Sequence, residues 1–234
     1  MAPYLSFIIP AYNEESRIEQ SLHKAVEYFA GQSYAAEIIV VDDGSRDGTV
    51  RVAHSFPSVR VLQQPRNRGK GAAVRRGMLE SNGVYRIFSD ADFSTPVGET
   101  AKVLGRLEQG ADICIGSRAL DETYIKVHQP WYRERMGKLF NFFVQALLFK
   151  GIKDTQCGFK GFRAEAAEAV FSRTKLDGFS FDVEALYLAK LLRLKVDQVA
   201  VEWYNDERTT VNPLTDATRM FFELLSIKRL HRNG

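Results

Sequence analysis

Residues 37–45 read Glu37-Ile-Ile-Val-Val-Asp-Asp-Gly-Ser45, in which a continuous apolar run leads directly into two carboxylates and a glycine. An unbroken apolar run of this length is typical of a parallel strand that is buried on both faces. Two other strand-like segments end in the same way. Segment 5–9 leads into Pro10-Ala-Tyr-Asn-Glu14, and segment 84–89 leads into Asp90-Ala-Asp92. Because open α/β sheets bind ligands at the carboxyl ends of their strands, these acidic ends predict one common site.

Strand-like and helical patterns alternate along the first half of the chain. Apolar residues recur at helical spacing in 15–30, and Asn82-Gly83 is a stop signal for a helix over 69–81. This alternation predicts an α/β fold with a mostly parallel twisted sheet and helices on both faces. The predicted strands are 5–9, 37–41, 59–63, 84–89 and 112–115, and the predicted helices are 15–30, 47–54, 69–81 and 97–109.

Beyond residue 118 the alternation fails, and we expect substrate specificity to lie there. A charged and aromatic loop over 119–135 precedes a strongly apolar helix over 136–150. This helix belongs either to the core or to a bilayer surface beside a lipid. Its apolar residues spread so widely around the helix that each interpretation can hold for a different face.

The final helical segment, 214–230, is amphipathic and basic. Three interpretations stay open: binding to an anionic membrane surface, packing back onto the catalytic domain, and formation of a homodimer. The predicted apolar face consists of Leu214, Ala217, Met220, Phe221, Leu224, Leu225 and Ile227, and the basic residues are Arg219, Lys228, Arg229, His231 and Arg232.

Length and composition predict a single compact domain over residues 1–234. Of the 234 residues, 45% are hydrophobic and 26% are charged, which is usual for a globular protein, and a net charge of +3 is too small to indicate nucleic-acid binding. Cys114 and Cys157 do not make a disulfide framework. Cys114 lies in an apolar run, so we expect a buried thiol and a reducing compartment.

Two further expectations concern membranes and targeting. Glu14 and Glu15 interrupt the apolar start of the chain, so the sequence predicts no signal peptide. It also contains no run of about 18 apolar residues, so we expect no transmembrane helix.

The pair Asp90 and Asp92 suggests a metal site. On an extended backbone, residues i and i+2 point the same way, so both carboxylates can converge on one cation. Hard oxygen ligands suit Mg²⁺ or Mn²⁺, and such an ion can stabilise a departing diphosphate. An isolated Asp-x-Asp is more often a solvated turn, so the interpretation depends on the neighbouring motifs.

These motifs together resemble a known family. Pro10–Glu14, Asp42-Asp-Gly-Ser45 and Asp90-Ala-Asp92 are similar to the donor-site motifs of inverting, nucleotide-sugar-dependent glycosyltransferases with the GT-A fold. Within that family the chain most resembles the dolichyl-phosphate β-glucosyltransferases and other polyprenyl-phosphate glycosyltransferases. The resemblance covers residues 4–212, and the order of the motifs is specific. It extends through Asn67-Arg-Gly-Lys-Gly71, Gly116-Ser-Arg118, Asp154-Thr-Gln-Cys-Gly-Phe-Lys160 and Phe179-Ser-Phe-Asp-Val-Glu184.

The resemblance implies roles in binding a nucleotide-sugar donor. Asp42 falls at the ribose-binding position of the motif, whereas Asp43 fits a nucleotide contact and a turn cap equally well. Lys70 precedes a helix and is placed to meet the donor, and the helix N-terminus itself favours an anion. The resemblance implies a nucleotide pocket lined by Pro10, Tyr12, Glu14 and Asp42, with Asp90 at the sugar or metal and Asp92 as the principal metal ligand.

A lipid phosphate acceptor would require positive charge, because guanidinium groups match phosphate oxygens. Arg118 is the best supported candidate because it closes a motif at a strand end. Relatives often carry Gly-Ser-Lys after the strand near Trp203, whereas this chain has Arg208-Thr-Thr210, so Arg208 is a possible substitute. The full set of acceptor candidates is Arg118, Arg133, Arg135, Gln156, Lys160 and Arg208.

The nature of the acceptor decides the expected mechanism. A phosphate monoester has a second pKa of about 6, so it is already an oxyanion at neutral pH and needs no general base. Attack opposite the leaving nucleoside diphosphate would invert the anomeric configuration. Asp90, Asp92 and Arg118 are then the catalytic candidates. Asp182 and Glu184 are the fallback bases if the acceptor is instead a sugar hydroxyl.

We therefore expect metal-dependent transfer of a sugar, with UDP-glucose as the leading donor, to a polyprenyl phosphate. The alternatives are GDP-mannose or another UDP-sugar with a saccharide acceptor, or a nucleotide-sugar-binding protein without turnover. The expected location is cytoplasmic, peripheral at the cytoplasmic face of a membrane. The expected organisation is a donor half over 1–118, an acceptor half over 119–212 and a C-terminal helix over 213–232.

Overall fold

The structure, a computed structural model, describes residues 2–206 and 213–232, without the side chains of 122, 132, 133 and 213–217. Within the described residues, no helix is long and apolar enough to cross a membrane.

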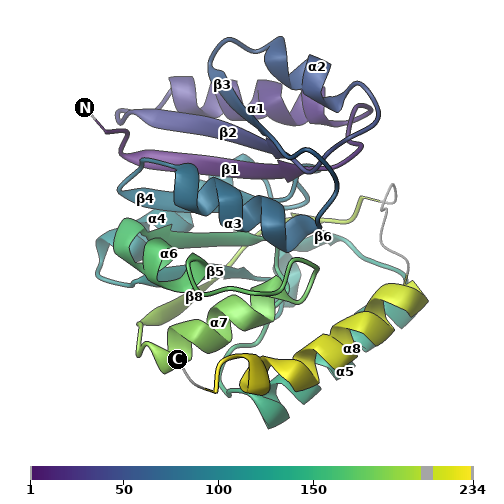
Figure 1. Cartoon of the computed structure of the whole chain (residues 1–234). Helices are drawn as coiled ribbons and strands as arrows, with labels where there is room; N and C mark the ends of the chain where they lie inside the picture. Colours follow the sequence, from purple (N-terminus) through teal and green to yellow (C-terminus); the bar gives the residue numbers. More distant parts are fainter. Residues whose placement is uncertain (1, 207–212, 233–234) are drawn as a thin grey trace.

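A seven-stranded sheet with the order β3-β2-β1-β4-β7-β5-β8 forms the centre of the molecule (Figure 1). Strand β7 runs antiparallel to both of its neighbours, and the other pairs are parallel. The predicted α/β fold with a mostly parallel sheet is confirmed. The strands are β1 (Leu5–Ala11), β2 (Ala36–Asp42), β3 (Val59–Gln63), β4 (Tyr85–Ser89), β5 (Ile113–Ser117), β7 (Phe159–Arg163) and β8 (Val196–Ala200).

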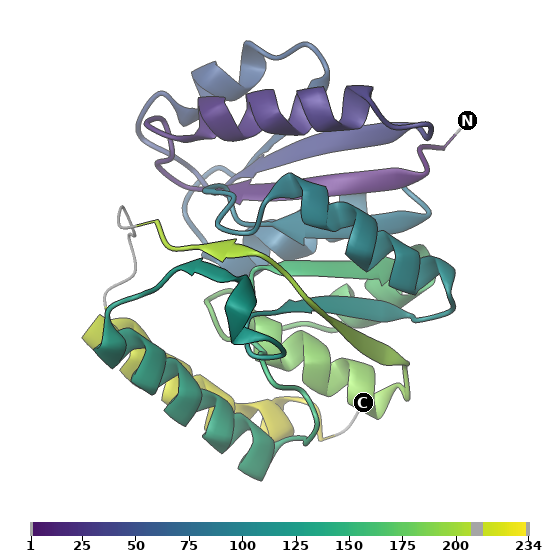
Figure 2. The same cartoon turned by 180° about the vertical axis from the view of Figure 1, so that it is seen from behind.

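Helices cover both faces of the sheet, as Figures 1 and 2 show from opposite sides. One face carries α3 (Lys70–Glu80), α6 (Ala164–Phe171) and α7 (Phe181–Leu191), and these helices share one hydrophobic core. The other core lies under α1 (Ile18–Ala30), α2 (Thr49–His54) and α4 (Thr100–Glu108), with the 3-10 turn η1 (Val97–Glu99) before α4.

Past residue 118 strands and helices no longer alternate one by one, as the sequence indicated, although two further strands of the central sheet follow. β7, α6, α7 and β8 follow one another along the chain. Strand β7 enters the sheet between β4 and β5, antiparallel to both, and is therefore not part of a regular βαβ unit.

Helices α5 (Trp131–Leu147) and α8 (Pro213–Leu230) lie side by side at one end of the molecule, beyond the sheet (Figures 1 and 2). The rings of Phe143 and Phe221 meet between them in a T-shaped contact, with 5.4 Å between the centroids. Helix α5 begins five residues before the predicted start at 136. A separate pair of short strands, β6 (Ile125–Val127) and β9 (Trp203–Tyr204), lies nearby after the 3-10 turn η2 (Glu122–Tyr124).

The apolar residues of α8 divide between two environments. Met220, Leu224 and Ile227 are buried against the catalytic domain, which confirms the interpretation that the helix packs back. Phe222 and Leu225 remain 65% and 51% exposed. The exposed apolar residues of α5 are Trp131, Leu139 and Phe142, while Val144 is fully buried, so each helix has a buried and an exposed apolar face.

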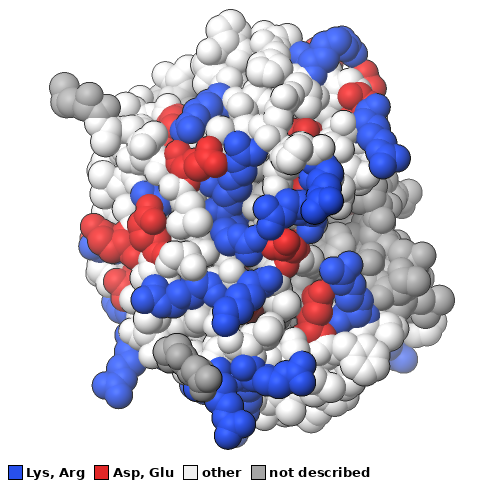
Figure 3. Space-filling view, viewed as in Figure 1, with Lys and Arg blue, Asp and Glu red and all other residues white. Residues whose placement is uncertain are grey.

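The remaining sequence expectations concern thiols and surface charge. Cys114 and Cys157 are both free and buried, as expected for Cys114. Figure 3 shows basic side chains gathered across the face that α3 covers, with acidic side chains between them. Several are paired, such as Arg75 with Asp177 and Arg76 with Glu80. This mixed charge agrees with the small net charge of the sequence.

The contact between α3 and the sheet depends on Gly77. A Cβ at this position would overlap the Cγ2 of Ile8 and lie 2.9 Å from the Cγ2 of Val41. We predict that Gly77→Ala destabilises the fold by about 1–3 kcal/mol, as expected for overpacking. The matched control is Gly105→Ala in α4, where a Cβ meets nothing within 4 Å and should stabilise by about 0.5–1 kcal/mol. Urea unfolding measures both; equal effects of the two substitutions would contradict the close packing of α3.

Candidate active site

A cavity of about 440 Å³ lies at the carboxyl ends of β1 and β4, beside the N-terminus of α3. Pro10, Tyr12, Glu14 and Lys70 line it, as predicted for the donor pocket. We call it the donor-side cavity. Its wall also includes residues from beyond 118, so the predicted donor half does not match one region of space. The other lining residues are Ala11, Arg17, Asp43, Asn67, Arg68, Gly69, Ala73, Asp90, Ala91, Asp92, Gly178, Phe179, Arg219, Met220 and Glu223.

An ion pair between Lys70 and Asp90 lies in this cavity, with 2.5 Å between Lys70 Nζ and Asp90 Oδ1. Lys70 is the first residue of α3, and Gly69 before it adopts a φ of +111°. A Cβ at Gly69 would also overlap the carbonyl oxygen of Asp177, so glycine is needed for this entry into the helix. Burial lowers the pKa of Lys70, but the charges of Asp90 and Asp182 outweigh it and raise the pKa overall, so the ammonium stays protonated.

Asp90 and Asp92 line the same cavity, as the sequence predicted, but for a different geometric reason. β4 ends at Ser89, and the two carboxylates follow in a turn rather than on an extended strand. Asp92 Oδ1 accepts a hydrogen bond of 2.9 Å from the N–H of Ser94, which fixes this turn. Burial, and then the charge of Asp90, raise the pKa of Asp92 above its ordinary value. The site therefore disfavours two uncompensated negative charges.

Arg17 is a site residue that the sequence analysis missed. Its guanidinium is buried and bound by Glu14, three residues earlier. It also lies 3.9 Å from Asp92 Oδ2 and 3.6 Å from Asp206 Oδ2. The only signal in the sequence was the i,i+3 spacing of Glu14 and Arg17, which is common on any helix.

The adjacent carboxylates Asp42 and Asp43 have different roles. Asp43 lines the cavity and accepts hydrogen bonds from the backbone N–H groups of Arg68 and Gly69, at 2.9 and 2.8 Å. Asp42 is buried and accepts from the N–H groups of Gly44 and Ser45, at 3.1 and 3.2 Å. The structure thus places Asp43 in the cavity wall and makes Asp42 the turn cap. This corrects the expectation that Asp42 lines the pocket.

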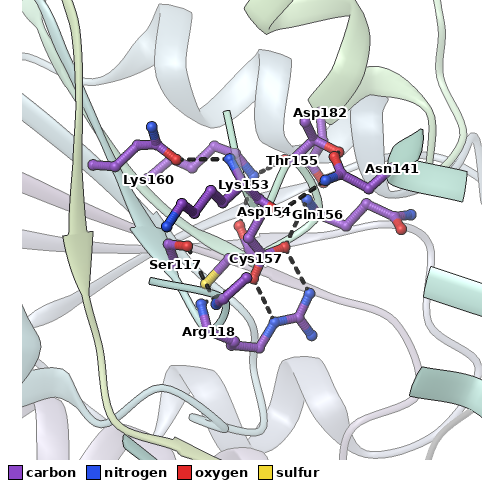
Figure 4. Close-up of polar contacts among 12 residues, drawn as sticks. Ser117, Arg118, Asn141, Lys153, Asp154, Thr155, Gln156, Cys157, Lys160 and Asp182 are labelled. Carbon is purple, nitrogen blue, oxygen red and sulfur yellow. Dashed lines mark hydrogen bonds and ion pairs between the residues drawn. The ribbon is translucent and has the colours of Figure 1, made fainter. Parts of the chain in front are cut away.

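A second cavity, of about 300 Å³, lies beside α5 and includes Arg118 and Gln156 in its wall. We call it the acceptor-side cavity. Arg118 forms a bidentate pair with Asp154, with distances of 2.7 Å from Nε to Oδ2 and 2.9 Å from Nη2 to Oδ1 (Figure 4). The guanidinium also lies over the ring of Trp203, 5.4 Å from its centroid. Burial raises the pKa of Asp154, but Arg118 outweighs it and lowers the pKa to about 2.

The segment 154–158 connects the two cavities. Gln156 faces the acceptor side, while the carbonyl of Gly158 accepts a 3.1 Å hydrogen bond from the N–H of Asp90. A Cβ at Gly158 would overlap both carboxylate oxygens of Asp90. The glycine therefore allows the carboxylate to pack directly against this segment.

The structure corrects the roles predicted for Lys160 in acceptor binding and for Asp182 as a base. The ammonium of Lys160 is fully buried, donates to the carbonyl of Cys157 at 2.6 Å and pairs with Asp182 (Figure 4). Because burial removes Lys160 from solvent, it does not offer its charge to an acceptor phosphate. Asp182 is likewise 5% exposed and committed to this pair, so it is poorly placed to act as a base.

Two of the remaining candidates, Glu184 and Arg135, line neither of these cavities. Glu184 is fully buried and binds the N–H groups of Lys175 and Leu176, both at 2.9 Å, so its role is structural. Arg135 is exposed on α5, with its guanidinium 5.1 Å from the centroid of the Trp131 ring. The side chain of Arg133 and the whole of Arg208 lie outside the described residues. Among the described residues, no group of three or more His, Cys, Asp and Glu could hold a metal alone.

The family model for glycosyl transferase family 2 matches residues 6–171, which include the motifs at 10–14, 42–45 and 90–92. The dolichyl-phosphate β-glucosyltransferase of Dictyostelium discoideum is 36% identical over 96% of this chain and 74% of its own length. The enzyme of the same name from Drosophila melanogaster is 38% identical over 95% of this chain and 74% of its own length.

A solved structure shares the fold at lower sequence identity. It is glucosyl-3-phosphoglycerate synthase from Mycobacterium tuberculosis in complex with Mn²⁺, UDP and phosphoglyceric acid. Its TM-score is 0.73 at 19% identity, and the match covers 98% of this chain and 79% of that one. A family match over most of the chain, together with relatives above 30% identity along nearly all of it, establishes the family. This chain is therefore a glycosyltransferase that belongs to glycosyl transferase family 2.

Proposed function

We propose that the protein transfers glucose from UDP-glucose to dolichyl phosphate, with inversion at the anomeric carbon. One observation carries this proposal. A donor-side cavity holds Asp90, Asp92 and Lys70, and an acceptor-side cavity holds Arg118. The segment 154–158 connects them, because its first three residues line the acceptor-side cavity and the carbonyl of Gly158 binds the N–H of Asp90. The names of the relatives from Dictyostelium and Drosophila supply the sugar and the acceptor.

A divalent cation, Mg²⁺ or Mn²⁺, fits the donor-side cavity. The wall holds five carboxylates and four cationic side chains, so a nucleoside diphosphate would add negative charge to a site that has no excess of positive charge. Burial, and then the charge of Asp90, raise the pKa of Asp92 in the same wall. Asp92 and Asp90 would hold the ion together with the donor's phosphates, the usual way in which Mg²⁺ binds with few protein ligands. When bound, the ion would neutralise charge on the departing diphosphate.

The chain's own residues account for the other requirements of the reaction. Lys70 contributes a protonated ammonium at the helix N-terminus, where an anion is favoured. Arg118 contributes a guanidinium held in one orientation by Asp154, which limits the entropy lost when it meets a phosphate. A phosphate acceptor is already ionised, so the reaction needs no general base. Asp182 can therefore stay paired with Lys160 during the reaction.

We propose that the protein works at the cytoplasmic face of a membrane, attached by the outer faces of α5 and α8. Exposed apolar side chains gather on these two helices, which lie side by side. Helix α5 lines the acceptor-side cavity, and α8 lines the donor-side cavity. A dolichyl chain stays in the bilayer, so the active site must come to the headgroup plane. The exposed residues are Trp131, Leu139, Phe142, Phe222 and Leu225.

The direct test is a transfer assay with radiolabelled UDP-glucose, dolichyl phosphate and Mg²⁺ or Mn²⁺. Label should enter the organic phase as a β-linked product, and a chelator should abolish the transfer until the metal is restored. Parallel reactions with GDP-mannose, other UDP-sugars and saccharide acceptors test the alternatives. Transfer only from another donor, or only to a soluble acceptor, would replace the proposal, and binding of the nucleotide sugar without any transfer would indicate a non-catalytic protein.

The position of Asp90 can be tested through Gly158. We predict that Gly158→Ala lowers turnover about 100-fold, because the new methyl group displaces the Asp90 carboxylate and misplacements near 1 Å have effects of this size. Gly98→Ala is the control, since a Cβ there meets nothing within 4 Å. Turnover and the urea midpoint are measured together. A Gly158→Ala protein that keeps wild-type turnover would remove Asp90 from the reaction.

The membrane surface can be tested by flotation with anionic liposomes. Wild type should float at low salt, and Phe222→Asp combined with Leu225→Asp should reduce recovery about tenfold or more, because both side chains leave the apolar phase. Val84→Asp combined with Leu191→Asp is the control, since these side chains are 50% and 46% exposed elsewhere on the molecule. Equal recovery of the two variants would contradict membrane binding through these faces. The exposed faces would then be candidates for a homodimer interface, which sedimentation would detect.

A further inference from the structure

The inner face of α8 forms part of the donor-side cavity. Arg219, Met220 and Glu223 line it together with Asp90 and Asp92, although α8 lies far from them in the sequence. These α8 residues lie opposite Gly178, where a Cβ would stand 3.5 Å from Glu223 Oε1 and 3.8 Å from Arg219 Nη2. Helix α8 thus forms part of the wall of the donor-side cavity.

The C-terminal end of α8 is fixed to the catalytic domain. His231 Nε2 lies 2.7 Å from Glu184 Oε1 in a buried contact, and Lys175 Nζ donates to the carbonyl of Leu230 at 2.6 Å. Leu224 and Ile227 are buried in the core that α3, α6 and α7 share. With this end and this face of the helix held, Arg219 has a defined place at the cavity wall.

Arg219 differs from the other cations of the cavity in how it is paired. Lys70, Arg17 and Arg68 are bound by carboxylates at the strand ends and loops, namely Asp90, Glu14 and Asp177. Arg219 donates from Nε to Glu223 Oε1 at 2.9 Å, one turn along the same helix, and its side chain is 69% exposed. Exposed i,i+4 pairs contribute little to stability, so an incoming anion can take over this guanidinium at small cost.

One carboxylate oxygen of Glu223 could accept a hydrogen bond from a ligand in this cavity. Its Oε2 is buried and has no hydrogen-bond partner among the residues that the structure describes. A buried carboxylate oxygen of this kind is normally satisfied by a ligand group or an ordered water. At the wall of a nucleotide-sugar cavity, the available donors are the hydroxyl groups of the substrate and its hydration water.

We propose that Arg219 binds the diphosphate of the donor and that Glu223 positions its guanidinium. The inference rests on the proposed function only in requiring a nucleoside diphosphate sugar as the donor. A guanidinium binds phosphate through two parallel hydrogen bonds, which suits a diphosphate better than the single point charge of lysine. It supplies positive charge at a site where carboxylates outnumber cations.

Calorimetry of the full chain with Mg²⁺ tests this role, using UDP, GDP and uridine as probes. Arg219→Gln should weaken the binding of UDP about tenfold or more and leave the affinity for uridine unchanged, because charge-assisted hydrogen bonds to phosphate are lost. Arg219→Lys should bind UDP more tightly than Arg219→Gln but more weakly than wild type. Glu223→Gln should weaken UDP less, and its effect should disappear in the Arg219→Gln background, as expected for a residue that acts through another.

Arg229→Gln is the matched control, because Arg229 is an exposed arginine in the last turn of the same helix and does not line the cavity. Arg219→Gln binding UDP as tightly as wild type would overturn the inference and leave the proposed function intact. Equal losses for UDP and uridine would also overturn it, since they would show a general change in the pocket. If wild type binds neither UDP nor GDP, the proposed function itself fails.

Discussion

The ion pair between Lys70 and Asp90 is the contact around which the site is built. It joins the N-terminus of α3 to the turn after β4, and it lies in a cavity where an unpaired charge would be costly. Three close approaches of backbone make it possible. Gly69 lets α3 begin against Asp177, Gly77 lets α3 pack on β1 and β2, and Gly158 makes room for the carboxylate. Any added side chain at these positions would shift one partner of the pair.

The pairing of cations with carboxylates also sets the electrostatics of the donor-side cavity. Each cation in the described wall already has a carboxylate partner, and buried cations such as Arg17 need theirs in order to be buried at all. An incoming diphosphate therefore meets a nearly neutral site rather than a basic one. In the proposed function, affinity would come from a metal that arrives with the donor and from cations that exchange partners. Such a site is consistent with the small net charge of +3.

Together, helices α5 and α8 contact both cavities and also carry an exposed apolar surface. Their buried residues pack on the catalytic domain, their flanks line the two cavities, and their outer faces keep large apolar side chains exposed. One helix pair thus reaches the nucleotide side through Arg219 and the acceptor side through Asn141 and Phe142. An apolar surface beside the acceptor-side cavity is the arrangement expected for an acceptor whose polar head reacts while its tail stays in lipid.

The sequence alone determined the fold class, five strands of the sheet and the acidic strand ends, because these depend on local periodicity and on motifs of adjacent residues. The resemblance of its motifs to a known family predicted one site for six residues that do line the donor-side cavity, namely Pro10, Tyr12, Glu14, Lys70, Asp90 and Asp92. Only the tertiary structure decided which of Asp42 and Asp43 faces the cavity, since both lie at the same strand end and differ only in the backbone N–H groups they meet. The tertiary structure also shows that Lys160 is buried with Asp182 and is therefore not an acceptor-binding residue. It adds Arg17 and the inner face of α8 to the wall of the donor-side cavity. Burial and long-range pairing decide these roles, and neither leaves a pattern in adjacent residues.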